Sequence, residues 1–195
     1  MLKYLLTAAL VAALLMAWIL TRPAAPRPYA QEYHAALDRF AGSTASVDAG
    51  LQRFESVYSD LTHRDVGRRM QTLYADPLYF NDSLKTIRQR EMLVSYMSAT
   101  GASLQESQID IEHVLRDGRD VFVRWTMHFK ASALGRPVES TSIGMTHLRF
   151  DAEGRIVLHQ DFWDSAAGLY RNLPVIGYAL QRVDRQMISA HVETE

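Results

Sequence analysis

Residues 121–130 read VFVRWTMHFK, and residues 147–163 read HLRFDAEGRIVLHQDFW. In the first stretch apolar side chains occupy every odd position, and the even positions between them are mostly polar. This period of two indicates a β-strand that turns one face towards a core. In the second stretch, DAEG at 151–154 is typical of the tight turn between two such strands. The two stretches together predict long antiparallel strands joined by short turns.

Helix-like segments precede these strands along the chain. Apolar residues recur at helical spacing within residues 46–61, 64–73 and 89–99. A short strand is expected at 78–80, and longer strands are expected from 109 to the turn at 117–120, at 121–130, at 139–150 and at 156–163. Helices that lie ahead of an antiparallel sheet are typical of an α+β domain. We therefore predict the α+β fold class.

The N-terminus carries an apolar run at 4–20, in which Thr7 is the only polar residue. A helix of this length is at the lower limit for crossing a hydrocarbon core of about 30 Å. The run fits either a cleaved signal peptide or an uncleaved anchor. Signal-peptide cleavage requires small residues just before the cleaved bond, and prolines and arginines at 22–28 interrupt the nearest such sites. The sequence therefore favours the anchor. Lys3 on one flank and Arg22 on the other leave the orientation undetermined.

Four segments follow from these patterns. Residues 1–21 are the expected membrane anchor or uncleaved signal, and 22–45 are a proline-rich spacer with a short helix. Residues 46–168 form the expected globular domain, and 169–195 form an amphipathic helix and tail. This last helix could pack on the sheet, lie at a dimer interface or lie on the membrane. We expect a single-pass protein of a bacterial inner membrane.

Composition excludes several classes of function. The chain of 195 residues has a formal net charge of -1, which predicts no basic surface for nucleic acid. It contains no cysteine, which excludes disulfides, thiolate metal sites and a cysteine nucleophile. The seven histidines do not form a metal-binding motif, and the glycines do not form a phosphate-binding loop. We therefore expect neither a metal nor a cofactor.

Four short sequence motifs occur in an order that resembles a known superfamily: LYAD at 73–76, FND at 80–82, LRFDAEGRI at 148–156 and HQDFWD at 159–164. With the order of helices and strands, they resemble the nuclear-transport-factor-2-like superfamily, and most closely its SnoaL-like branch. The resemblance covers about residues 46–170. It implies a cone-shaped fold in which a curved antiparallel sheet wraps around N-terminal helices. Because this fold hosts enzymes, binding modules and transport factors, function needs separate evidence.

Ketosteroid isomerase is one catalytic relative in this superfamily. The resemblance places Asp82 at its general-base position, Tyr58 at or within one residue of its oxyanion tyrosine, and Trp163 at a pocket aromatic. The second acidic donor of that family falls on Thr146, whose hydroxyl is a weaker donor than a neutral carboxylic acid. The isomerase set is therefore incomplete. Asp82 also fits an ordinary turn residue beside Asn81.

Limonene epoxide hydrolase is the second catalytic relative. The resemblance matches Arg124 to its arginine and Asp161 to its second aspartate. Its water-activating aspartate falls on Thr126, which cannot act as a base at neutral pH. An ion pair between Arg124 and Asp161 is still expected, either to orient a ligand oxygen or as a purely structural pair. SnoaL-like cyclases use one pocket aspartate as acid and base, which leaves Asp82 and Asp161 as the catalytic candidates.

The last expected strand places His159, Asp161 and Trp163 on one face. Three such side chains suit a pocket floor, and the alternative is a solvated outer face, which antiparallel sheets often have. Residues 121–130 present a conflict. The resemblance puts Arg124 in the pocket, whereas burial would turn Trp125 inwards.

Two functions of different classes remain open. The first is a catalytically silent domain that binds a small apolar ligand or a partner in its cone cavity. Its candidate ligand-binding residues are Tyr58, Arg124, Thr146, His159 and Trp163. The second is an isomerase, cyclase or hydrolase that acts on a small hydrophobic substrate through Asp82 or Asp161. Each of the two catalytic relatives has a required acid that this sequence lacks, so the sequence favours the binding function. The sequence leaves open whether the domain forms a homodimer.

Overall fold

The computed structural model describes residues 2–21, 28–133, 135–173 and 175–192, and it divides into two units, Met1–Glu32 and Tyr33–Glu195. The first unit contains helix α1 (Leu2–Thr21). Within the described residues, no helix combines the length and the apolar character needed to span a membrane. That finding does not support the predicted anchor at 1–21. Residues 22–27, at the start of the predicted spacer segment 22–45, lie outside the described residues.

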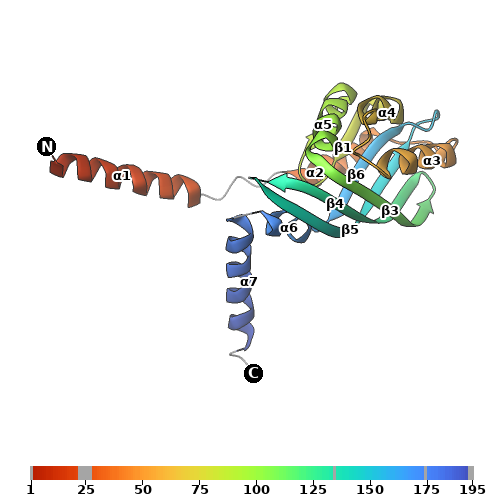
Figure 1. The fold of residues 1–195 in the computed structure, drawn as a ribbon. Coiled ribbons are helices and arrows are strands. Elements are labelled where there is room, and N and C mark those ends of the chain that lie inside the picture. The colour runs from red at the N-terminus through yellow and green to blue at the C-terminus, as the bar shows by residue number, and fades with distance from the viewer. Residues whose placement is uncertain (1, 22–27, 134, 174, 193–195) are drawn as a thin grey trace. The chain divides into compact units, whose positions relative to one another are not determined.

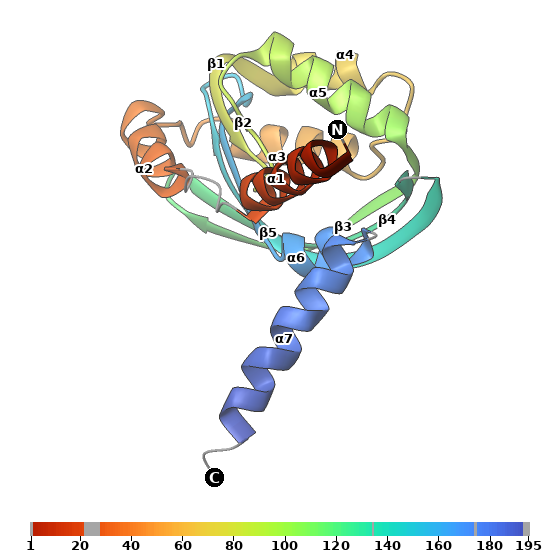
Figure 2. The same ribbon diagram turned by 90° about the vertical axis from the view of Figure 1, so that its left-hand side faces the viewer.

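The second unit is built on one curved sheet (Figures 1 and 2). Among the described residues, its six strands lie in the order β2-β1-β6-β5-β4-β3. Their bounds are β1 (Tyr74–Asn81), β2 (Thr86–Ile87), β3 (Leu104–Asp117), β4 (Asp120–Ala133), β5 (Arg136–Phe150) and β6 (Ile156–Trp163). Neighbouring strands are antiparallel, except that β1 and β6 run parallel. The long strands β3–β5 are those predicted by the period of two.

Three helices cover the inner face of the sheet: α3 (Val47–Tyr58), α4 (Val66–Leu73) and α5 (Arg90–Ser103) (Figure 2). Their apolar faces bury Phe54, Met70 and Leu93 against Val121 and Val123 of β4, and all five side chains are at most 2% exposed. Burial of this apolar area is the main force that holds the helices on the sheet.

The predicted α+β, nuclear-transport-factor-2-like fold is confirmed, with two corrections to the expected sheet. First, the sheet is not wholly antiparallel, because β1 runs parallel to β6 through Tyr79↔Leu158 and Phe80↔His159. Second, β1 begins at Tyr74, directly after α4, rather than at 78. Pairing with a neighbouring strand extends β1 beyond its local apolar pattern, and such non-local pairing is invisible in the sequence.

Helix α2 (Tyr29–Arg39) meets the outer face of the sheet from Tyr33 onwards. Ala36 packs with Tyr79 and Leu158, which point away from the main core. A buried polar cluster adds to this contact. Arg149 donates through one terminal nitrogen to the carbonyl oxygens of Leu37 at 2.7 Å and Phe40 at 2.9 Å. The guanidinium therefore satisfies acceptors at the end of α2 that the helix itself leaves free.

Asp120 joins the parts of this cluster. Its Oδ1 lies 2.5 Å from Arg149 Nε and 2.7 Å from His147 Nε2, while the other ring nitrogen of His147 lies 2.7 Å from the Tyr33 hydroxyl. Burial alone would raise the pKa of Asp120, but hydrogen bonds from Arg149 and His147 outweigh it and hold the pKa below its ordinary value. Burial lowers the pKa of His147. At neutral pH His147 is therefore an uncharged bridge between Tyr33 and Asp120.

The chain after β6 forms α6 (Ser165–Gly168), the 3-10 helix η1 (Tyr170–Asn172) and α7 (Ile176–Val192). Asp164 caps α6, since its Oδ1 accepts from Ala167 N at 2.9 Å. Arg171 pairs with Asp184 of α7 at 2.5 Å. The large exposed apolar residues of α7 include Ile176, Tyr178, Val183 and Met187. The surface on which this amphipathic helix docks stays a prediction.

Candidate functional site

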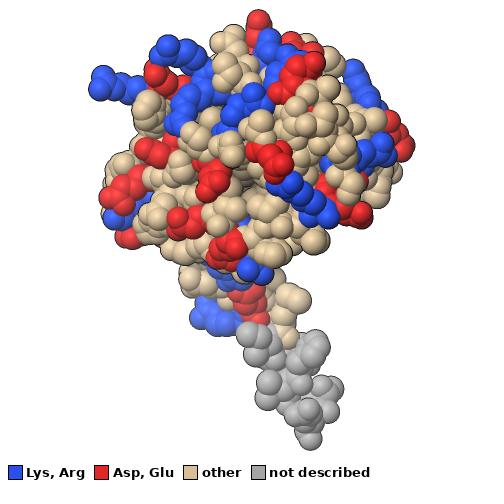
Figure 3. Space-filling view, turned by 90° about the vertical axis from the view of Figure 1, so that its right-hand side faces the viewer, with Lys and Arg blue, Asp and Glu red and all other residues tan. Residues whose placement is uncertain are grey.

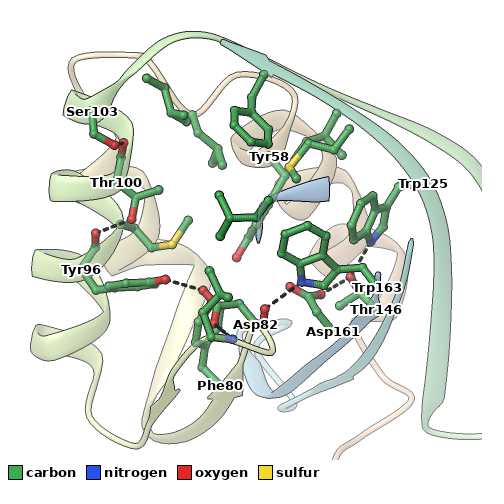
Figure 4. A pocket seen from close by; sticks show the side chains of 18 of the residues that line it. Tyr58, Phe80, Asp82, Tyr96, Thr100, Ser103, Trp125, Thr146, Asp161 and Trp163 are labelled. Atoms are coloured by element: carbon green, nitrogen blue, oxygen red, sulfur yellow. Dashed lines mark hydrogen bonds between the residues drawn. The ribbon is translucent and has the colours of Figure 1, made fainter. Parts of the chain in front are cut away.

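An apolar pocket of about 270 Å³ lies between the inner face of the sheet and helices α3 and α5 (Figure 4). Most of its lining is aromatic or aliphatic. Its carboxylates belong to Asp82 and Asp161, and none of the described lining residues is lysine or arginine. Aromatic lining residues include Phe54, Tyr58, Phe80, Tyr96, Trp125, Phe129 and Trp163. An apolar cleft with a few converging polar groups is the usual form of a small-molecule site.

Two indole rings form part of the wall, Trp125 from β4 and Trp163 from β6 (Figure 4). The Trp125 ring nitrogen donates to the Thr146 hydroxyl at 2.8 Å, and the Trp163 ring nitrogen donates to the backbone oxygen of Asp82 at 2.8 Å. Each buried N–H thus has a partner, as expected for tryptophan in a core. These bonds also tie the apolar wall to the polar groups of the pocket.

Each indole lies directly against a glycine. A Cβ atom on Gly144 of β5 would come within 2.4 Å of the Trp125 ring, and one on Gly168 of α6 would come within 2.6 Å of the Trp163 ring. Neither distance is compatible with a real side chain. Because these positions carry no Cβ, both rings can lie against the backbone there.

Asp82 follows β1 in a tight turn and reaches the pocket floor (Figure 4). Its Oδ1 accepts from the backbone nitrogens of Leu84 at 2.9 Å and Lys85 at 2.8 Å. Its Oδ2 accepts from the Tyr96 hydroxyl at 2.5 Å. Burial and this hydrogen bond raise the pKa of Tyr96, so the phenol stays a donor. Asp82 is thus both the turn residue and the pocket residue that the sequence offered as alternatives.

Asp161 of β6 is fixed by two partners. Its Oδ1 accepts from the Thr146 hydroxyl at 2.5 Å and lies 2.9 Å from His159 Nε2. Thr146 accepts from Trp125 and donates to Asp161, so its only hydroxyl proton is committed to the aspartate. The threonine at the position of the isomerase's second acid therefore orients an aspartate within the pocket.

A hydrogen-bonded chain continues from His159 behind the pocket wall. Its Nδ1 lies 2.8 Å from the Tyr74 hydroxyl, which lies 2.5 Å from the Tyr58 hydroxyl. Tyr74 and His159 are at most 1% exposed, whereas Tyr58 and Asp161 line the pocket. Burial raises the pKa of both tyrosines well above the ordinary value.

Arg124 does not lie in the pocket, so the predicted Arg124–Asp161 ion pair is wrong. Its Nε donates to Glu112 on the outer face at 3.0 Å, and its side chain is 58% exposed. Thr126, two residues along β4, donates to the same carboxylate at 2.5 Å. The period of two explains the correction: burial of Trp125 on the inner face turns both neighbours outwards.

The structure brings the other predicted site residues together. Tyr58, Asp82, Thr146, Asp161 and Trp163 line one pocket, and His159 lies behind it in contact with Asp161. Their roles as catalytic or ligand-binding residues stay predictions. Sequence reasoning missed Tyr74 and Tyr96 as polar members of the site. Tyr96 lies on the same face of α5 as the buried residues Leu93 and Met97. Only its hydroxyl group distinguishes it from an ordinary core residue of that helix.

The remaining surface gives no further indication of a site. Basic and acidic side chains intermingle on the face in Figure 3, as the small net charge predicts. Across the described part of the chain, no three histidine, aspartate or glutamate side chains converge as a metal site would require. The apolar pocket is therefore the candidate site.

Comparison with known proteins agrees with this fold. A SnoaL-like domain model matches residues 54–159, which is more than half of the chain. No curated protein matches the sequence. The solved structure of an LEH-like epoxide hydrolase from M. tuberculosis has 16% identity and a TM-score of 0.53, with 71% of this chain and 96% of that chain covered.

Two further solved structures share the architecture. A candidate SnoaL-like polyketide cyclase from Shewanella putrefaciens CN-32 has 20% identity and a TM-score of 0.53, covering 61% of this chain and 92% of that chain. A phenazine biosynthesis-related protein from Pseudomonas aeruginosa has 14% identity and a TM-score of 0.53, covering 65% of this chain and 86% of that chain. At these identities the likeness shows the fold alone. Together with the domain match, it shows that the chain belongs to the SnoaL-like domain family.

Proposed function

We propose that this SnoaL-like domain binds a small, neutral, mostly apolar molecule that carries an oxygen function. The observation that carries the proposal is the apolar pocket with two carboxylates and no cation among its described lining residues. A volume of about 270 Å³ is close to the lower end of the range for small-molecule pockets. The small volume of the pocket favours a compact ligand, and its two carboxylates disfavour an anionic one.

The polar groups support an oxygen-bearing ligand. Asp82 and Asp161 are acceptors held by other residues, and the Tyr58 hydroxyl lies at the same pocket. A ligand hydroxyl could donate to either carboxylate, and a ligand carbonyl could accept from Tyr58. A purely apolar molecule would cover these groups without replacing their hydrogen bonds to water, which disfavours binding.

A second function, acid–base catalysis by an isomerase or cyclase, is favoured by the environment of the same carboxylates. Each lies in a largely apolar site beside a titratable partner, Tyr96 for Asp82 and His159 for Asp161. This is the type of pairing that enzymes use for proton transfer. Hydrolysis by the epoxide-hydrolase arrangement is disfavoured, because Arg124 and Thr126 lie on the outer face with Glu112.

Tryptophan fluorescence tests the ligand class. In full-length protein with Trp18→Phe, emission comes from Trp125 and Trp163, which both line the pocket. We expect cyclohexanol and cyclohexanone to give saturable changes, methylcyclohexane to bind more weakly, and cyclohexanecarboxylate to bind at least about tenfold more weakly at neutral pH, because of like-charge repulsion. Asp161→Asn is expected to improve binding of the carboxylate selectively. Equal affinity for cyclohexanol and the carboxylate in the Trp18→Phe protein would contradict the proposal.

We also propose that the N-terminal segment tethers the domain to a bacterial inner membrane. The apolar run at 4–20 and the spoiled cleavage sites after it support this proposal. Full-length protein is expected to stay in the membrane pellet after a carbonate wash. Deletion of residues 1–22 is expected to release a folded domain, checked by circular dichroism. Recovery of a mature chain that starts after Ala25 or Ala30 would instead establish a cleaved signal.

A further inference from the structure

Helix α7 carries a stripe of apolar side chains along one face. Ile176, Leu180, Val183 and Met187 follow one another at intervals of four, three and four residues, which brings them to the same side of a helix. Ile176 is 45% exposed, Val183 is 51% exposed and Met187 is 65% exposed. Apolar side chains that are exposed singly are ordinary, whereas a continuous stripe of them marks a surface that binds a partner or a membrane.

The charges around this stripe are mostly positive. Asp184 is the single acidic residue of α7, and it pairs with Arg171 of η1 at 2.5 Å. Together η1 and α7 contain three arginines against one aspartate, which is a net charge of +2 with histidine neutral. The two arginines of α7 itself are Arg182 and Arg185. A partner surface with negative charge is therefore favoured.

A shallow hollow on the polar side of α7 is lined by Tyr178, Arg182, Arg185 and Gln186. These side chains offer guanidinium, hydroxyl and amide donors, a set that suits the oxygens of a phosphate group. Arginine side chains are also long enough to extend towards a membrane surface while the apolar side of their helix lies in it. A phospholipid bilayer supplies both phosphates for the hollow and an apolar layer for the stripe.

A second copy of the chain is the alternative occupant, because the spacing of the stripe would also suit a coiled coil. A coiled coil requires an apolar repeat that is sustained over about three to four heptads. Helix α7 has 17 residues, which is fewer than three heptads. A bilayer covers a short stripe as well as a long one, so the length of α7 favours the membrane.

We propose that α7 lies in the surface of a bilayer of anionic phospholipids, with its apolar stripe towards the acyl chains and with Arg182 and Arg185 among the phosphate groups. This docking goes beyond the proposed ligand binding, and it does not depend on the proposed N-terminal tether. It assigns to the C-terminal helix a membrane-binding surface of its own.

The start of α7 is fixed next to the pocket. A Cβ atom on Gly177 would collide with the backbone oxygen of Arg171, and the Gly177 nitrogen donates to the Leu173 oxygen at 2.9 Å. Leu169, which directly precedes η1, lines the pocket. A docked α7 therefore holds this pocket wall near the bilayer, where small apolar molecules accumulate.

Labels on different sides of α7 test the docking. The chain contains no cysteine, so Met187→Cys can be labelled with nitrobenzoxadiazole in the full-length protein. Gln181→Cys is the matched control, since it lies about 120° around the helix. On vesicles of phosphatidylcholine and phosphatidylglycerol, we expect a nitroxide phospholipid to quench the label at 187 at least about threefold more than the label at 181. Val183→Cys replaces Met187→Cys if circular dichroism shows that the latter does not fold.

Substitution of the arginines tests the charge. Arg182→Gln with Arg185→Gln, in the labelled Met187→Cys protein, is expected to weaken docking on the anionic vesicles at least about tenfold. Added salt should weaken the docking as well, because it screens the attraction. Arg68→Gln with Arg119→Gln removes the same charge from exposed residues outside α7 and should leave the docking unchanged. Equal docking of the two double variants would overturn the proposal.

Other occupants of the stripe give different results. Energy transfer between copies labelled at 187, without quenching by the lipid, would show an interface between copies and overturn the proposal. Short-wavelength emission from the same label in the absence of lipid would show that α7 packs on its own domain, which would overturn it too. Carbonate washing reports on the N-terminal segment, and cyclohexanol binding reports on the pocket. Failure of α7 to dock is therefore distinguishable from failure of either of those proposals.

Discussion

Trp125→Ala is expected to lower the free energy of unfolding by about 3–5 kcal/mol. The indole is 6% exposed and packs closely against Gly144, so alanine would leave a large cavity in the core. Thr146 would also lose the donor at 2.8 Å that fixes its hydroxyl towards Asp161. We therefore expect weaker binding of cyclohexanol as well. Urea unfolding followed by far-ultraviolet circular dichroism measures the first effect, and tryptophan fluorescence measures the second.

Trp125→Phe is the matched control for this prediction. It keeps an aromatic ring at position 125 but removes the N–H donor and part of the indole, so a smaller loss of about 1–3 kcal/mol is expected. The difference between the two variants measures the packing that an aromatic ring at this position contributes. A loss below about 1 kcal/mol for Trp125→Ala would show that the indole does not fill the core as described.

Arg149→Met should lower the free energy of unfolding by a similar amount, about 3–5 kcal/mol. The arginine side chain is 6% exposed, and its partner Asp120 is 25% exposed. Methionine would retain the apolar stem but leave Asp120 without its cation, and it would remove the donor to the carbonyl oxygens of Leu37 and Phe40. Limited proteolysis should then cut near residues 33–40 first, because α2 loses its polar attachment.

Arg155→Met provides the control for a surface ion pair. Arg155 pairs with Asp151 at 2.8 Å, and its side chain is 41% exposed. The substitution is therefore expected to lower the free energy of unfolding by only about 0–1 kcal/mol. Addition of Asp120→Asn to Arg149→Met should recover part of the lost stability, because the unpaired buried charge is then removed. Equal effects of Arg149→Met and Arg155→Met would refute the described role of the buried cluster.

Local patterns were sufficient to predict the long strands β3–β5, and they placed His159, Asp161 and Trp163 on one face of β6. Alternation within 121–130 is a direct consequence of burial on one side of a strand, and burial dominates the energy of this segment. The same pattern contained the correct orientation of Arg124, since Trp125 and Met127 both favour the inner face. The resemblance to an epoxide hydrolase placed Arg124 on the wrong face of β4. A match between sequence positions takes no account of the free energy that burial of a charged side chain would cost.

The polar chain from Tyr58 to Asp161 could not be predicted in the same way. Tyr74 follows α4 directly, and its hydroxyl meets Tyr58 and His159 only after α3 and β6 are packed against β1. Such contacts depend on residues far apart in sequence and carry no periodic pattern. Tyr74 therefore reads as an ordinary core aromatic until the tertiary structure is known.

The glycines beneath Trp125 and Trp163 have a consequence for how the family can diversify. Neither Gly144 nor Gly168 is among the residues that line the pocket, yet any side chain there would clash with an indole ring of the wall and displace it. The dimensions of the cavity and the chemistry at its floor thus depend on separate positions. Substitutions at these two glycines can therefore change the shape of the cavity while Asp82, Asp161 and their partners stay unchanged.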